Sequence, residues 1–423
     1  MKRVATFLLV AGLVFAGAAP ALAAPPSSDP TIDAKAAAAW LAGQVNASGF
    51  IPQPANPANP NLSVTAQAVT ALAAAGVGRT QVAALLDYLG NHIEEFVVPA
   101  ATDDPGALGY LILAAVAGGD DPTSFGPAHA DLVTRLVATQ QASGLFGAAD
   151  ATFDGAYRQG LALLALHAAG VADAAGVTWL EGQQCADDLW TSFRADTAVP
   201  CPAVDPNTFS GPDTNSTALA VLGLQAQGAT GPAAAGVTAL ETVRNAGAGW
   251  GFLARDDQPT DANSTGLVLQ ALRTVNGAAD APGVNALLAL QVGCTGDVAD
   301  RGGIAFQPGA GGALAPDGFA TVQATPALAE VALPITSATI SDTVPTPCAS
   351  TATSTTTVST TVAASGTTAT TAVTVPGSPA TVAPAAPAQL PRTGSSAVPM
   401  AFIAICLLAV GATFVGATRR RRT

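Results

Sequence analysis

The sequence predicts an all-α fold built from about six helical hairpins. An Ala/Leu-rich motif recurs six times between residues 61 and 328, and a more amphipathic segment precedes most of its copies. The stretch that contains them, residues 29–348, is long for one ordinary hydrophobic core. Repeated hairpins that bury their apolar faces against one another account for both the motif and the length.

Each copy of the motif predicts an inner helix. The best preserved copies are Asp213–Leu224 and Asp261–Leu272, and the weaker ones are 61–72, 102–113, 154–166 and 317–328. Their closing leucines lie 41, 53, 58, 48 and 56 residues apart. Each copy begins with a turn or capping residue and is then apolar nearly all round, which indicates a helix that is buried on most of its faces.

A second helix precedes most copies and predicts an outer layer. Three of these segments open alike and are followed by a long polar side chain: Gly176–Leu180 by Gln184, Gly236–Leu240 by Arg244, and Gly283–Leu287 by Gln291. Trp40 with Gln44 and Leu136 with Gln140 are earlier relatives of this pattern. A turn of glycine and an aromatic residue comes next, at Gly49-Phe50, Gly144-Leu-Phe146, Gly249-Trp250 and Gly302 to Phe306.

With this order of outer helix, turn, loop and inner helix, the chain resembles the α/α-toroid superfamily of terpenoid cyclases, prenyltransferase β-subunits and the helical domain of cobalamin carriers. The Gln-to-Gly-to-aromatic spacing is similar to the QW repeats of the cyclases. The run from Asp213 to Leu219 is similar to inner-helix starts in the carriers. The resemblance implies an (α/α)6 toroid over residues 29–348, and a continuous two-helix superhelix is the alternative architecture.

In a ring, the starts of the inner helices gather around one mouth, where polar groups at the rim of an apolar cavity are typical of a binding site. Asp, Asn, Ser and Thr are also the favoured N-caps of helices, so capping is the alternative role for each of them. The candidate ligand-binding residues at this mouth are Asn61, Ser63, Asp104, Asp154, Tyr157, Asp213, Asn215, Asp261, Asn263, Asp317 and Phe319.

The motifs that the related enzymes use are missing from the sequence. The Asp pairs 103–104, 120–121, 187–188 and 256–257 lack the Asp two positions earlier that an Asp-x-Asp-Asp acid needs. Aromatic residues make up only 5% of the chain, too few to line a cavity that stabilises carbocations. Neither an Asp/Cys/His zinc set nor a thioester motif is present, so we expect no enzyme of these types, no metal and no cofactor. Tyr110, Tyr157, Arg158 and Asp154 form the one local grouping suited to acid/base chemistry.

Four cysteines, an even number, lie outside the apolar C-terminal segment, and this favours disulfides in an oxidising compartment. Three connectivities are possible. We expect Cys185–Cys201 and Cys294–Cys348, because each of these bonds would hold one local segment.

The N-terminus has the pattern of a secretory signal peptide over residues 1–23. Lys2 and Arg3 precede an apolar run over residues 4–18, and Ala21-Leu22-Ala23 fits the small-residue cleavage site. The apolar run is short for a membrane span. The sequence therefore predicts an exported chain that begins near Ala24.

The C-terminus combines four features in a fixed order. Residues 349–389 are Thr, Ser, Ala, Val and Pro without a charge, which indicates a disordered, wall-spanning linker. Leu390, Pro391, Arg392, Thr393 and Gly394 spell LPRTG, an apolar segment over 397–417 is long enough to cross a membrane, and four arginines follow at 419–422. Residues 390–423 resemble the cell-wall sorting signal of Gram-positive surface proteins. The resemblance implies that a sortase cleaves between Thr393 and Gly394 and joins Thr393 to peptidoglycan.

Between residues 24 and 393 ten basic residues face 29 acidic ones, a net charge of −19, which makes nucleic acid an improbable partner. The predicted function is therefore a secreted, wall-attached surface protein whose toroid binds a small molecule, a glycan or a protein. A cobalamin-like molecule is one version of the small ligand. The alternatives are an extracellular enzyme that acts on a glycan or lipid, and a structural spacer or adhesin with a filled centre.

Overall fold

The computed structural model describes residues 30–99, 101–148, 155–336 and 338–348, all within one compact unit. These residues form thirteen α-helices, one short 3₁₀ helix and a two-stranded hairpin, so the all-α expectation is confirmed for the part described. The predicted signal peptide, linker, sorting signal and apolar C-terminal segment lie outside the described residues. Among the helices that are described, none has the length and hydropathy needed to cross a membrane.

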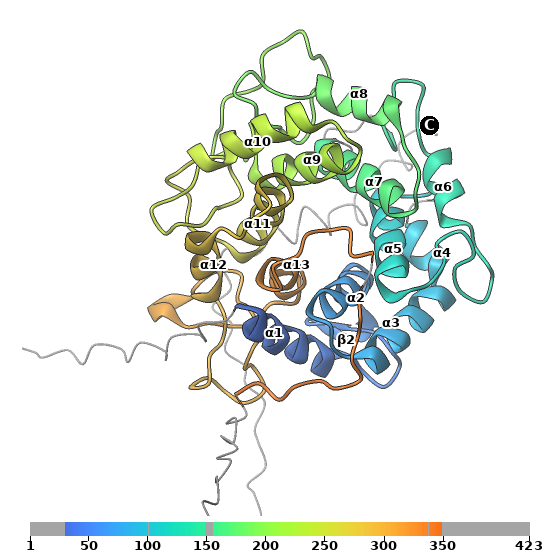
Figure 1. The fold of residues 1–423 in the computed structure, drawn as a ribbon, viewed down its shortest axis with the longest axis vertical. Helices are drawn as coiled ribbons and strands as arrows, with labels where there is room; N and C mark the ends of the chain where they lie inside the picture. The colour runs from blue at the N-terminus through green and yellow to red at the C-terminus, as the bar shows by residue number, and fades with distance from the viewer. Residues whose placement is uncertain (1–29, 100, 149–154, 337, 349–423) are drawn as a thin grey trace, which may run out of the picture. The chain divides into compact units, whose positions relative to one another are not determined.

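Six helices form the inner ring, one for each copy of the repeated motif. They are α2 (Leu62–Ala75), α5 (Pro105–Gly118), α7 (Ala156–Ala168), α9 (Thr214–Ala226), α11 (Ala262–Asn276) and α13 (Gly318–Leu328). Each packs against the next, and α13 packs back against α2, so the ring closes (Figure 1). This closure excludes the open superhelix, because the two ends of a superhelix do not meet.

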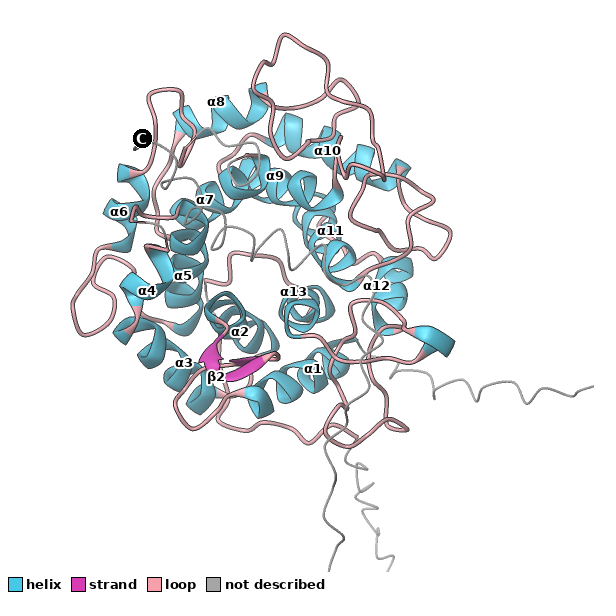
Figure 2. Ribbon diagram, turned by 180° about the vertical axis from the view of Figure 1, so that it is seen from behind, coloured by secondary structure: helices cyan, strands magenta, loops and turns pink. Residues whose placement is uncertain are grey.

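Six outer helices surround this ring (Figure 2). They are α1 (Pro30–Gln44), α3 (Arg79–Asn91), α6 (Leu132–Ala138), α8 (Ala174–Gly182), α10 (Thr230–Thr242) and α12 (Ala281–Leu288). The smaller elements lie in the connections: β1 (Pro52–Gln53) pairs antiparallel with β2 (Asn56–Pro60), α4 (Ile93–Val97) follows α3, and the 3₁₀ helix η1 (Ala310–Gly312) precedes α13.

The core lies in and around the inner ring, whose helices are buried on nearly every face. Small residues let neighbouring backbones approach closely. A Cβ atom on Gly160 of α7 would lie 2.2 Å from the carbonyl oxygen of Leu219 in α9, and a Cβ atom on Gly223 would lie 2.5 Å from the carbonyl oxygen of Gly160. The contact between α7 and α9 therefore requires glycine at both positions.

The long polar side chains at the ends of the outer helices join neighbouring hairpins. Gln140 donates to a carboxylate oxygen of Asp173, the N-cap of α8, at 2.5 Å. Gln291 donates to the carbonyl oxygen of Asp33 in α1 at 2.9 Å, which links the last outer helix to the first. Most of the side chains that the sequence marked as a repeat thus link neighbouring outer helices, whereas Gln44 bonds to the Trp40 carbonyl within α1.

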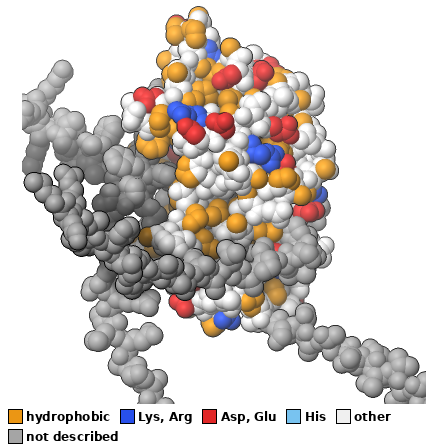
Figure 3. Space-filling view, turned by 90° about the vertical axis from the view of Figure 1, so that its left-hand side faces the viewer, with side chains coloured by type: hydrophobic (Ala, Val, Ile, Leu, Met, Phe, Trp, Pro, Cys, Tyr) orange, Lys and Arg blue, Asp and Glu red, His pale blue; other side chains and the backbone are white. Residues whose placement is uncertain are grey.

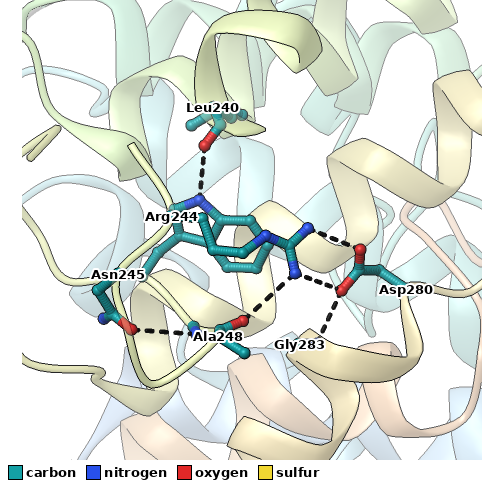
Figure 4. A network of polar contacts seen from close by, with 8 residues as sticks. Leu240, Arg244, Asn245, Ala248, Asp280 and Gly283 are labelled. Carbon is teal, nitrogen blue, oxygen red and sulfur yellow. Dashed lines mark hydrogen bonds and ion pairs between the residues drawn. The ribbon is translucent and has the colours of Figure 1, made fainter. Parts of the chain in front are cut away.

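Arg244 makes the most extensive of these links (Figure 4). Its guanidinium donates to both carboxylate oxygens of Asp280, the N-cap of α12, at 2.7 and 2.6 Å. It also lies 4.3 Å from the ring centroid of Trp250, a cation–π distance, and the Trp250 indole donates to the Leu240 carbonyl at 2.7 Å. Removing the two charges from water is unfavourable by itself. The two parallel hydrogen bonds between Arg244 and Asp280 compensate, because they satisfy both ions.

A threonine near the start of four inner helices fastens the preceding loop, and sequence reasoning did not single it out. Its hydroxyl accepts a backbone N–H from the Gly/aromatic turn. The four pairs are Thr65 with Ile51 at 3.2 Å, Thr217 with Trp190 at 3.0 Å, Thr265 with Trp250 at 3.1 Å, and Thr321 with Ile304 at 3.0 Å. In the sequence, the regular spacing between the capping residue and this threonine could have revealed its role.

Both expected disulfides are present. Cys185 is bonded to Cys201, within the long connection between α8 and α9, and Cys294 is bonded to Cys348. The pairing expected from sequence is therefore confirmed.

The segment after α13, residues 329–348, crosses from the end of α13 to the α2–α3 side of the ring; we call it the strap (Figure 1). The Leu333 N–H donates to the side-chain oxygen of Gln270 at 3.3 Å, and Ser341 forms a parallel bridge with Val77 just after α2. Ile335 and Ile340 are buried against the core. The strap thus covers the end of the ring where the inner helices finish.

Charged and apolar side chains are interspersed on the face drawn in Figure 3. Among the described residues the exposed large hydrophobic side chains are Val137 in α6, Val199 and Phe209 in the connection between α8 and α9, and Val298 after α12.

Candidate functional site

The polar residues at the inner-helix starts act as N-caps. The side chain of each accepts the backbone N–H three residues later, which satisfies one of the free donors of the first helical turn. The distances are 3.3 Å for Asn61, 2.8 Å for Asp104, 2.7 Å for Asp213, 2.7 Å for Asp261 and 2.8 Å for Asp317. Asp154 lies outside the described residues. The observed geometry is therefore that of helix capping, the alternative role considered for these residues.

Two of the caps are withdrawn from solvent. Asp213 and Asp261 are each 2% exposed. Burial raises the pKa of Asp213 to about 6 and that of Asp261 to about 7, while hydrogen bonds from Ser216 and Ser264 act in the opposite direction. Buried carboxyl groups of this kind serve the helix start and are poorly placed to reach a ligand.

A hydrogen-bonded network crosses the middle of the ring. The hydroxyls of Tyr110 and Tyr157 lie 2.5 Å apart, and Gln323 is hydrogen-bonded to the Tyr157 hydroxyl. Asn263 donates to the Gln323 side-chain oxygen at 2.8 Å, and Gln323 donates to Gln67 at 3.3 Å. These five side chains come from α5, α7, α13, α11 and α2, so the network joins five of the six inner helices.

Burial raises the pKa of both tyrosines in this network. For Tyr110 desolvation is the largest cause, and Tyr157 adds to it; for Tyr157 desolvation is opposed by its bonds to Tyr110 and Gln323. Both phenols therefore stay protonated at neutral pH and act as hydrogen-bond donors. A neutral tyrosine pair in a closed network is suited to holding helices together.

The remaining rim residues are half-buried around this network. Ser63 contributes its backbone oxygen, which accepts from Gln67 at 3.3 Å, and Asn215 accepts from the Thr214 hydroxyl at 3.4 Å. Phe319 packs against the core. Apart from Asp154, the structure thus brings the predicted rim residues to the inner-helix starts, as part of the ring's own packing.

The centre of the ring is filled. The cavity on the axis has a volume of about 20 Å³, which is space for about one water molecule. Leucines from α5, α7, α9 and α11 surround it, and Leu333 of the strap closes it on one side. Among the described residues, the rim therefore surrounds a cavity too small for a terpenoid, a sugar or a cobalamin-like molecule.

The acid/base grouping expected from sequence is internally satisfied. Tyr110 and Tyr157 bond to each other, and Arg158 pairs with Asp104 at 3.1 Å across the starts of α7 and α5. Arg158 is one-seventh exposed, so this ion pair is largely shielded from water. The described members of the grouping face one another and no open pocket.

One open groove lies on the outer wall, between α3, the end of α5 and the strap. Its volume is about 680 Å³, and Val82, Leu86 and Ile340 line it together with Arg79 and Asp120. Burial raises the pKa of Asp120. Sequence reasoning missed this groove because its walls are more than 200 residues apart in the chain. In the ranges that the structure describes, no group of three His, Cys, Asp or Glu residues is placed to hold a metal ion.

Comparison with solved structures places the chain among α/α-toroids. An unsaturated glucuronyl hydrolase specific for heparin superposes with a TM-score of 0.51 at 13% identity, over 74% of this chain and 99% of that one. The type II terpene cyclase MstE from Scytonema superposes with a TM-score of 0.50 at 14% identity, over 71% and 97%. Both likenesses concern the fold alone.

A third similar structure, ent-copalyl diphosphate synthase from Streptomyces platensis, has a TM-score of 0.41 at 19% identity; the match covers 64% of this chain and only 50% of that one. No protein-family model matches the sequence, and no curated protein is significantly similar to it. The closed double ring of helices therefore defines the class of the fold, an α/α-toroid. The function has to be inferred from the residues of this chain.

Proposed function

We propose that this protein is secreted, attached to peptidoglycan by a sortase, and displays a filled α/α-toroid that binds a glycan or a protein on its surface. The 20 Å³ centre leaves no room for an enclosed ligand, which supports binding at the outer surface rather than inside the ring and fits the adhesin alternative as well. The sequence features that support attachment are the signal-peptide pattern, the uncharged linker and the LPRTG segment at Leu390–Gly394.

Two further features support an extracellular, non-enzymatic role. Four cysteines form two disulfides, which persist in oxidising compartments. Tyr110, Tyr157 and Arg158, three of the four candidates for acid/base chemistry, bond to one another or to Asp104 inside the ring, and the fourth candidate, Asp154, lies outside the described residues. Both features fit a surface that binds a ligand without converting it. They also fit the alternative of a wall-attached adhesin.

Attachment is tested with Thr393→Ala, a change at the carbonyl that a sortase would attack. We expect the wild-type chain in the muramidase-released wall fraction, with Thr393 joined to a peptidoglycan peptide by mass spectrometry. The Thr393→Ala chain should be lost from that fraction by at least tenfold. Ser395→Ala, two residues beyond the cleavage point, is the matched control and should behave as wild type. Wild-type protein that keeps residues 394–423 in the wall fraction would contradict attachment.

The filled centre is tested by native mass spectrometry of residues 24–348 incubated with extract of the producing organism. We expect the bare protein mass under every condition, because the axis has space for about one water molecule. Glycan arrays and capture on wall material should instead give binding, because a ligand that does not enter the ring has to bind its outer surface. A discrete small-molecule adduct that Leu333→Trp abolishes would overturn the proposal of surface binding.

A further inference from the structure

The second disulfide closes a covalent loop around the last inner helix. Cys294 and Cys348 are 54 residues apart in sequence and have a Cα–Cα distance of 5.5 Å. Between them lie η1, α13 and the strap. Because the linker predicted from the sequence begins at residue 349, tension on it would reach the toroid directly at Cys348.

Apart from the disulfide, the strap is held by few polar contacts near its end. Ser341 and Arg79 hold it through the bonds Ser341 N–H to Gly76 O at 3.0 Å and Arg79 N–H to Ser341 O at 3.1 Å. The Arg79 side chain also contacts Ile340 and Asp342, but Arg79 and Asp342 side chains are 62% and 78% exposed, where ion pairs contribute little. A pull on Cys348 alone would break these contacts one after another.

Peeling of the strap would reach the ring itself. Leu333, which closes the central cavity, is bonded to Gln270 at 3.3 Å and would leave next. The following element is α13, which packs between α11 and α2 and closes the ring. Loss of α13 would therefore open the toroid.

Cys294 lies in a segment that is held far more firmly. Val292 exchanges two backbone hydrogen bonds with Gly302 and Gly303, each 2.9 Å, and Ala305 donates to Leu290 at 2.9 Å. Gln291 donates to Asp33 in α1 and to Gly302, both at 2.9 Å. A load on Cys294 is shared by several of these bonds at once, because they lie side by side around one turn.

We propose that the Cys294–Cys348 disulfide is a mechanical clamp: it carries tension from the linker into the turn after α12 and so shields the strap and α13 from being peeled off. The source of the tension rests on the proposed attachment to the wall. The clamp itself is a property of the toroid, so a pulling experiment on purified protein tests it whether or not the chain is attached to peptidoglycan.

The test is single-molecule force spectroscopy on residues 24–389, which contain the whole described toroid. The protein is held by a clickable residue in place of the exposed Thr238 of α10 and pulled from a tether after residue 389. In Cys294→Ser/Cys348→Ser we expect an early step of about 70 Å, the extended length of the 20-residue strap. The disulfide-bonded protein should lack this step. Its total extension should be shorter by roughly 180–190 Å, because the 54-residue loop stays closed.

Cys185→Ser/Cys201→Ser is the matched control, since that disulfide lies off the load path, and it should lack the early step as wild type does. If the variant at 294 and 348 does not fold, the oxidised wild type is held at constant force and then treated with a reductant. The 70 Å step should then follow bond cleavage. An early strap step in the oxidised protein, or no such step after reduction, would overturn the clamp.

Discussion

At the scale of single residues, the same side chains were candidates for two roles, and local geometry distinguishes them. Asp213 and Asp261 each accept the N–H three residues later at 2.7 Å and are nearly inaccessible to solvent. Asn263 bonds to Gln323 within the ring. The sequence identified the right positions, because caps and rim residues share the same polar chemistry and the same place in the motif.

The buried caps predict a pH-dependent stability. The pKa values of Asp213 and Asp261, about 6 and about 7 in the folded protein, exceed the ordinary value of 3.8. Between pH 4 and 7 the folded state therefore binds protons that the unfolded state has lost. The stability that these neutral carboxyls contribute is complete below about pH 4 and is lost as the pH rises through 6–7. Each group contributes on the order of 3–4 kcal/mol to this change at most.

Asparagine caps the same helix starts without ionising. The double variant Asp213→Asn/Asp261→Asn should therefore gain stability relative to wild type as the pH rises from 4.5 to 8. The measurement is the free energy of unfolding in denaturant at both pH values. Asp317→Asn, at a half-exposed cap, is the control for the loss of a capping carboxylate at an inner-helix start. An unchanged pH dependence in the double variant would show that Asp213 and Asp261 ionise normally.

At the scale of elements, helix contacts depend on residues that have no side chain at all. The close approach of α7 and α9 places the Gly160 backbone against Leu219 and Gly223. The sequence shows glycine inside both helices, which lowers helix propensity and would ordinarily weaken the prediction of a helix. The packing gives the reason for these glycines.

Gly160→Ala should destabilise the protein by about 3 kcal/mol, because the added methyl group would overlap the Leu219 carbonyl and push α7 away from α9. Gly231→Ala in α10 is the matched control: nothing lies within 4 Å of the position, and alanine favours a helix. Its stability should equal or slightly exceed that of wild type. Denaturant unfolding of the two variants measures both effects, and equal stabilities would contradict the close contact.

The connections between elements were less predictable. The repeated Gln or Arg at the end of the outer helices is visible in sequence, but its partner is not. Gln140 and Arg244 reach the N-caps of the next outer helices, Asp173 and Asp280, which are 33 and 36 residues away. A partner at that distance depends on how hairpins stack, which local periodicity does not contain.

At the scale of the whole molecule, ring closure and the filled centre are the two decisive features. The ring is closed by the packing of the last inner helix, α13, against the first, α2. Side chains of all six inner helices and Leu333 of the strap then occupy its axis. Similar toroids named as a hydrolase and a cyclase share the fold, and the fold by itself does not transfer their activities.

The sequence by itself indicated the six inner helices, most of the outer helices, the capping residues at five inner-helix starts and a favoured pairing of the four cysteines. Each of these depends on residues close in the chain or on a short list of pairings. Only the tertiary structure decided that the ring closes, that its centre is full, and that the strap runs from α13 to α3. Those outcomes depend on how side chains from distant segments of the chain pack together. Gln67 and Gln323, for example, are in contact although 256 residues separate them in the sequence. Periodicity predicts which face of a helix is buried, but only packing decides whether space remains where six such faces meet.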